Sequence, residues 1–238
     1  MGLFDMFRRD EEIEITRSAL DEANDPSGND DAITNLIKQL TGVGIEGVSR
    51  FSGAREVADK ALAKANGDVE AAVDAVVRQH LVGGAAGGFL TSLGGFLTMV
   101  VAIPANVFEF YVQATRMTAA IAHLRGHDVA DDRIRTAVLL TLVGSNSADV
   151  LARAGVSVGT SAALNVAGKN LPKSALMVIQ KAVGFRILRS VGERVFARVG
   201  KLVPLAGGVF GAGIDLAMMK RIADQARVEF PRTGLGTV

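Results

Sequence analysis

The fold class follows from residues 105–125, which read ANVFEFYVQATRMTAAIAHLR. Residues spaced three or four positions apart form one line along a helix, here named the polar seam, and all but Ala120 are polar: Asn106, Glu109, Gln113, Arg116, Ala120 and His123. Nearly all the other residues are apolar, so a helix formed here is buried on most sides. The segment predicts a central helix whose seam faces water, a polar cleft or the interior of a bundle.

Helical periodicity continues on both sides of this segment. Apolar residues recur at helical spacing in four further stretches, at 33–40, 57–65, 69–76 and 133–143. Strand-like alternation of useful length does not occur in the sequence. The chain is therefore predicted to be all-α, a multi-helix bundle.

Local signals around the 69–76 stretch are specific. Asp68 precedes it and has the side chain of a helix N-cap. Asp74 and Arg78 are four positions apart, which predicts an ion pair on the exposed face of the helix.

Two segments combine many glycines with few charges. The first lies within residues 81–125, has a run of 28 residues without Asp, Glu, Lys or Arg, and carries Gly84 and Gly88 at a spacing that lets helices approach closely. The second, 203–230, repeats this spacing. We expect two glycine-rich apolar helical hairpins. The densely apolar part of the first, 89–103, is shorter than the ~20 residues of a membrane span, which leaves insertion into lipid and burial in protein both open.

Charge divides the chain into a tail and a domain. Residues 1–31 carry ten acidic residues and three arginines, although the whole chain has a net charge of +1. Acidic blocks of this kind are usually disordered. The sequence predicts a disordered acidic tail at 1–31, a single all-helical domain at 32–231 and a flexible C-terminus at 232–238. The tail is either solvated or covers a basic surface of the domain.

Several function classes lack the residues that they require. The chain has no cysteine, which excludes disulfides and thiolate chemistry, and its 5% aromatic content without Trp argues against nucleic-acid binding. Residues 42–47 spell G-x-G-x-x-G, but the residues before them favour a helix where a dinucleotide site needs a strand. His123 and His127 flank the helix-ending Gly126, so a shared metal-binding face is not expected. We expect no metal, no cofactor and no catalytic constellation.

A basic amphipathic helix is predicted near residues 186–201. Apolar residues such as Ile187 and Val191 lie opposite five cations: Arg186, Arg189, Arg194, Arg198 and Lys201. Such a face can rest on anionic lipid headgroups, or it can be a solvated face above a protein core. Both interpretations stay open.

The candidate ligand-binding residues are Glu109, Gln113, Arg116 and His123 of the seam, together with Asp215 of the second hairpin. Glu109 and Arg116 are seven residues apart, about 10.5 Å along a helix, which is too far for direct pairing. The neighbours of Arg116 are apolar or small, so its guanidinium needs a fixed acceptor on another helix. We expect Arg116 to be buried and paired with a carboxylate, of which Asp215 is the best candidate.

A resemblance to a known family covers about residues 35–231. The glycine-rich run 83–95, the Ile103-Pro104 step and the Arg116 helix that ends in IAHLRGHD resemble the EcsC family of bacterial proteins. The segment VPLAGGVFGAGID at 203–215 is similar to that family's Pro-x-x-Gly-x-x-x-Gly-Gly-x-x-Asn segment.

The chain departs from the family pattern in three places. Ala102 stands where the family usually has Asp, Asp215 stands where Asn is usual, and the turn at 125–128 lacks the family's aromatic residues. The family has no established reaction. Its name comes from a gene that accompanies an ABC-transporter pair, so the resemblance implies membrane-linked work.

Two hypotheses of different classes follow. The first is a non-enzymatic, cytoplasmic helical adaptor or accessory factor at the inner face of the cell membrane, with an anionic membrane surface or a membrane protein complex as its partner. The second is a soluble helical protein that binds an apolar or anionic, lipid-like small molecule at Glu109, Arg116 and His123. An enzyme is a weaker third reading, because no nucleophile–base pair or metal cluster is visible.

The acidic tail generates a first prediction. Limited proteolysis should remove the first 30 residues and leave a resistant core that begins near Asp31, because the tail buries little and its charges repel one another. Mass spectrometry of the fragments locates the cleavage. A protease-resistant N-terminus, or a truncated chain that aggregates, would contradict this prediction.

Overall fold

The computed structural model describes residues 30–48, 51–83, 105–143 and 206–233, with shorter runs at 176–177, 179–181, 183–184 and 187. Its elements confirm the predicted all-α class, since every described element outside one two-stranded sheet is a helix. In chain order they are α2 (Asp30–Thr41), the π-helix η1 (Gly42–Glu46), β1 (Gly47–Val48), β2 (Phe51–Ser52), α3 (Ala54–Lys64), α4 (Val69–Gly83), α5 (Ala105–Leu124), α6 (Asp132–Val143) and α10 (Ala206–Glu229).

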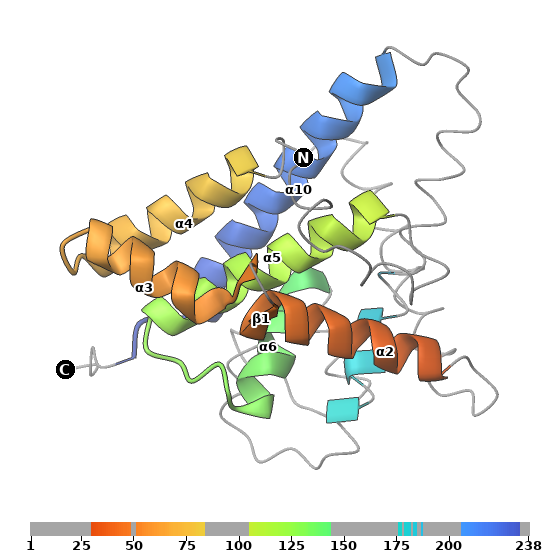
Figure 1. The fold of residues 1–238 in the computed structure, drawn as a ribbon, viewed down its shortest axis with the longest axis horizontal. Helices are drawn as coiled ribbons and strands as arrows, with labels where there is room; N and C mark the ends of the chain where they lie inside the picture. The colour runs from red at the N-terminus through yellow and green to blue at the C-terminus, as the bar shows by residue number, and fades with distance from the viewer. Residues whose placement is uncertain are drawn as a thin grey trace, which may run out of the picture.

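Helix α5 is the central element of the bundle (Figure 1). It contacts α2, η1, α3, α4, α6 and α10, so neighbours cover it on most sides. Met117, Ile121 and Ala114 are fully buried along it, as are Ala119 and Ala120. The prediction of a central helix buried on most sides is confirmed.

The glycine motif at residues 42–47 forms a close contact with α5 rather than a nucleotide site. Helix α2 precedes it, as the sequence predicted, and the motif itself forms η1 and the start of β1. A Cβ atom added to Gly44 would lie 2.9 Å from Cβ of Thr115 and 3.2 Å from the carbonyl oxygen of Val112. Glycine at this position therefore lets η1 approach the backbone of α5. The strands that follow pair antiparallel, Gly47 with Ser52 and Val48 with Phe51.

Helices α3 and α4 form an antiparallel pair that packs on α5. The backbone N–H of Gly67 donates to the carbonyl of Leu62, which closes the end of α3. The carboxylate of Asp68 accepts a hydrogen bond of 3.1 Å from the N–H of Ala71, which confirms Asp68 as the N-cap of α4.

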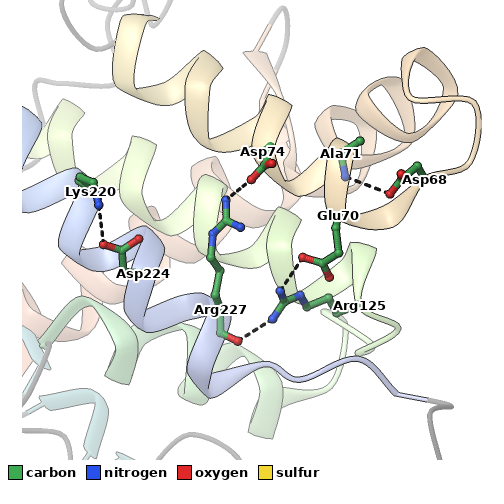
Figure 2. Close-up of polar contacts among 8 residues, drawn as sticks. All are labelled: Asp68, Glu70, Ala71, Asp74, Arg125, Lys220, Asp224 and Arg227. Carbon is green, nitrogen blue, oxygen red and sulfur yellow. Dashed lines mark hydrogen bonds and ion pairs between the residues drawn. The ribbon is translucent and has the colours of Figure 1, made fainter.

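The predicted ion pair between Asp74 and Arg78 is wrong, because Asp74 pairs with another helix. Arg227 of α10 donates to the carboxylate of Asp74 at 2.6 Å (Figure 2). A contact between helices far apart in the sequence has replaced a local pair along one helix, which spacing alone could not anticipate.

The end of α10 is fastened to the end of α5 through Arg125. Its guanidinium donates to the carbonyl oxygen of Arg227 and to the carboxylate of Glu70 (Figure 2). It also donates to the carbonyl oxygen of Phe230. The carbonyl of Arg125 in turn accepts hydrogen bonds from the backbone N–H and the hydroxyl of Thr233. The ring of His127 donates to the carbonyl of Pro231 at 2.8 Å. These contacts hold the C-terminal segment across α4 and α5.

Some sequence predictions lie outside the described residues. They include the acidic tail before residue 30, the core of the first glycine-rich hairpin at 84–104 and the basic face at 186–201. The second glycine-rich segment is helical from Ala206 onward. None of the described helices has both the length and the apolar content that a membrane crossing requires.

Substitutions of Gly126 and Gly67 allow a matched test of the hydrogen bonds between Thr233 and Arg125, which hold the C-terminal segment. Both have positive φ, +89° and +86°, so alanine at either position should cost about 1–2 kcal/mol of backbone strain. A Cβ at Gly126 would also lie 2.0 Å from Oγ1 of Thr233, whereas nothing lies within 4 Å at Gly67. Gly126→Ala should therefore lower the free energy of unfolding by about 1 kcal/mol more than Gly67→Ala, through loss of the Thr233 hydrogen bond.

Urea denaturation of the two variants measures this difference. Equal losses of stability would show that the contact between Thr233 and Arg125 contributes nothing to the fold.

Candidate functional site

The side chain of Arg116 connects three elements inside the bundle. It projects from α5 and is 9% exposed. Its Nε donates to Nε2 of His80 on α4 at 3.0 Å, and Nη1 donates to the carbonyl of Ser52 in β2 at 3.4 Å. Nη2 donates to Oε1 of Gln113, one turn earlier on α5. The guanidinium also lies over the ring of Phe51, 4.0 Å from its centroid, in a cation–π contact.

The hydrogen bonds of His80 fix its tautomer. Nδ1 lies 2.8 Å from the carbonyl oxygen of Val76, which can only accept, so the ring proton is on Nδ1. Nε2 is then the lone-pair nitrogen that accepts from Arg116. Burial of the ring, and next the charge of Arg116, lower the pKa of His80 to about 4. His80 is therefore a neutral acceptor at physiological pH.

Arg116 stays charged at physiological pH although no carboxylate of the described residues pairs with it. Burial lowers its pKa to about 10, which is still well above neutrality. The prediction that Arg116 is buried is confirmed, but the predicted partner is wrong, since Asp215 is half-buried on α10 and is not bonded to Arg116. Neutral acceptors from α4, α5 and β2 bind the guanidinium instead. The positions of these acceptors depend on how the elements pack, which the sequence alone does not show.

A pocket of about 430 Å³ opens at Arg116 between α3, α4 and β2. Its apolar lining comes from Phe51, Val57, Ala61 and Ala75, and its polar lining from Ser52, Gln79, Lys60, Lys64 and Arg116. Lys60 and Lys64 are exposed and lie one turn apart on α3, whereas Arg116 is almost fully buried. The charged residues that line it in the described part of the chain are all cations, with one buried and two at the surface.

Glu109, Gln113 and His123 of the seam do not line this pocket, although Gln113 bonds to Arg116. Glu109 is buried, burial raises the pKa of its carboxyl, and its Oε1 has no hydrogen-bond partner among the described residues. His123 lies at the far end of α5, where Nε2 is 3.3 Å from the carboxylate of Asp59. The structure therefore brings Gln113 and Arg116 together and leaves Glu109, His123 and Asp215 elsewhere.

Comparison with known proteins adds the family. A model of the EcsC protein family matches residues 26–232. The chain belongs to the EcsC family. Neither the curated proteins nor the solved structures contain a match to it. The resemblance stated from the sequence is confirmed over nearly the same residues.

Sequence reasoning missed four residues that shape the site in this EcsC chain: Phe51, Lys60, Lys64 and His80. The lysines lie on the exposed face of an amphipathic helix, where cations are ordinary. His80 carried a signal, because it continues the apolar line of Val69, Val73 and Val76 at helical spacing. This spacing predicts that His80 is buried, and a buried histidine needs hydrogen-bond partners.

The buried histidine generates a pH prediction. The ordinary histidine pKa is about 6.5, so between pH 6.5 and 4 the unfolded chain binds more protons at His80 than the folded chain. The stability that His80 contributes is complete above pH 6.5 and should be lost as the pH falls towards 4, by about 3 kcal/mol. His80→Gln should remove this part of the pH dependence, because glutamine still offers an acceptor to Arg116 but does not titrate.

Chemical denaturation at a series of pH values measures the effect, with His123→Gln as the control. Parallel pH profiles for His80→Gln and the parent chain would contradict the prediction. Direct titration of the His80 ring by NMR gives an independent measurement if the variant folds poorly.

Proposed function

We propose that this protein is a non-catalytic helical binding protein that takes a small molecule with an anionic group into the Arg116 pocket. The observation that carries the proposal is a buried cation that has no countercharge among the described residues and lines a pocket together with two exposed cations. The proposal moves the predicted small-molecule site from the whole seam to Gln113, Arg116 and the face of α3.

Arg116 has donors left for a ligand. A guanidinium carries five N–H groups, and three of them are directed at His80, Ser52 and Gln113. One N–H on Nη1 and one on Nη2 remain, and these two groups are available to hydrogen-bond the oxygens of an anion. The stacked ring of Phe51 and the three acceptors hold the guanidinium in place before a ligand arrives.

The rest of the lining supports a ligand with an apolar part. Val57, Ala61 and Ala75 present small or branched apolar side chains next to the ring of Phe51. Pockets for small molecules commonly combine such walls with a few converging polar groups. The volume of about 430 Å³ lies within the range of small-molecule sites.

The membrane-associated adaptor stays a prediction alongside this proposal. Its cations, Arg186, Arg189, Arg194, Arg198 and Lys201, lie outside the described residues. The two hypotheses agree on an anionic partner and differ in whether a pocket or a helix face receives it.

Calorimetry with a panel of anions tests the proposed function. The full chain should bind small organic phosphates, sulfates or carboxylates, with affinity that falls as salt rises, because all the charges in the pocket are positive. Lys64→Gln should weaken binding by about fivefold, the size expected for one exposed charge. Lys38→Gln removes an equally exposed lysine from α2, outside the pocket, and should leave the affinity unchanged.

Absence of binding by every anion of the panel would overturn the proposed function. Equal losses of affinity in Lys64→Gln and Lys38→Gln would also overturn it, because binding would then follow total charge and not the pocket.

A further inference from the structure

The charges around the pocket point to a particular anionic group. We infer that the pocket binds a phosphomonoester, and that Glu56 competes with this group for Lys60. The inference rests on the proposed function and deepens it, because it names the chemical class of the ligand and an internal competitor at the same site.

The local charge matches a dianion. Arg116, Lys60 and Lys64 contribute three positive charges to the lining, and no Asp or Glu belongs to the lining in the described part of the chain. Glu56 is the acid next to the site, and it pairs with Lys60. The charges of Arg116 and Lys64 have no acidic partner among the described residues. A phosphomonoester carries about −1.5 to −2 at pH 7, whereas a carboxylate, a sulfate monoester or a phosphodiester carries one negative charge.

The arrangement of the donors favours the same group. Lys60 and Lys64 are four residues apart on α3, so their side chains leave the same face of the helix about 6 Å apart along its axis. Arg116 reaches the pocket from α5 and has two N–H groups left to donate. Cations from two helices thus surround one volume, where a phosphomonoester presents three terminal oxygens that can accept from Arg116 and from a lysine.

Glu56 occupies one of these cations in the absence of ligand. Its carboxylate is hydrogen-bonded by Lys60 and by Ser52, and these bonds lower the pKa of Glu56 below its ordinary value. Ser52 also lines the pocket and gives its carbonyl oxygen to Arg116. A phosphomonoester that contacts Lys60 therefore competes with Glu56 for this ammonium group. Neutralising Glu56 should release Lys60 and strengthen binding.

The first experiment compares four small probes on the full chain at pH 8: methyl phosphate, dimethyl phosphate, methyl sulfate and acetate. Methyl phosphate should bind about tenfold more tightly than the three monoanions. Its affinity should fall as the pH is lowered through about 6, where the second proton joins the phosphate. Monoanions that bind as tightly as methyl phosphate would overturn the inference, yet would leave the proposed anion site in place.

The second experiment uses variants that match in structure. Glu56→Gln should strengthen methyl phosphate binding by about threefold, and Lys60→Gln should weaken it by a similar factor. Lys220 and Asp224 form the same type of exposed pair, four residues apart, on α10 away from the pocket (Figure 2). Asp224→Asn and Lys220→Gln should therefore change nothing. Unchanged affinity in Glu56→Gln would remove Lys60 from the site and overturn the inference.

The third experiment identifies the source of the group. Co-sedimentation with vesicles that contain phosphatidic acid, but not with vesicles that contain phosphatidylglycerol, would assign the site to a lipid headgroup with a phosphomonoester. Binding of methyl phosphate without binding to either vesicle would assign it to a soluble phosphomonoester. Failure of both methyl phosphate and phosphatidic acid to bind would overturn the inference.

Discussion

The described structure depends on one constraint, a charged guanidinium buried on a helix that other elements cover on most sides. Helix α5 is central, and Arg116 projects from its middle with 9% exposure. Removing a charge from water is costly unless fixed polar groups replace the lost hydration. His80, Ser52 and Gln113 supply these groups, and the ring of Phe51 adds the cation–π contact. Satisfying one side chain therefore fixes α4 and β2 against α5.

The pocket is a consequence of this arrangement. Helix α3 follows β2 directly in the chain and returns through a closed turn into α4, so fixing β2 and α4 also positions α3. Its amphipathic pattern buries Val57, Ala58 and Ala61 and leaves the lysines outward. Lys60 and Lys64 consequently reach the rim above Arg116. The same contacts that stabilise the fold place three cations around one volume.

The sequence predicted the elements far better than their pairings. Periodicity along one helix predicted α5, its burial and the buried Arg116, because these depend on spacing within a single segment. The predicted partners were wrong where the true partner comes from a distant segment. Arg116 is bonded to His80 and not to Asp215, and Asp74 is paired with Arg227 and not with Arg78. Contacts between helices depend on how the helices pack, and a single sequence does not reveal that packing. The lysines of the pocket were missed for a related reason, since they resemble any solvated helix face.

The chemistry of the partners of Arg116 connects stability with binding. A carboxylate beside Arg116 would have cancelled its charge, and the site would have been electrically neutral. Carbonyl oxygens and a neutral imidazole replace the hydration of a cation but leave its net charge, so the positive potential extends into the pocket. Because the surroundings are buried, this potential is screened less than that of surface charges. In the proposed function, an approaching anion is attracted first by the exposed lysines and then by a guanidinium that is already held in place. The neutral network of His80, Gln113 and Ser52 is the feature on which that proposal depends, because it holds Arg116 without cancelling its charge.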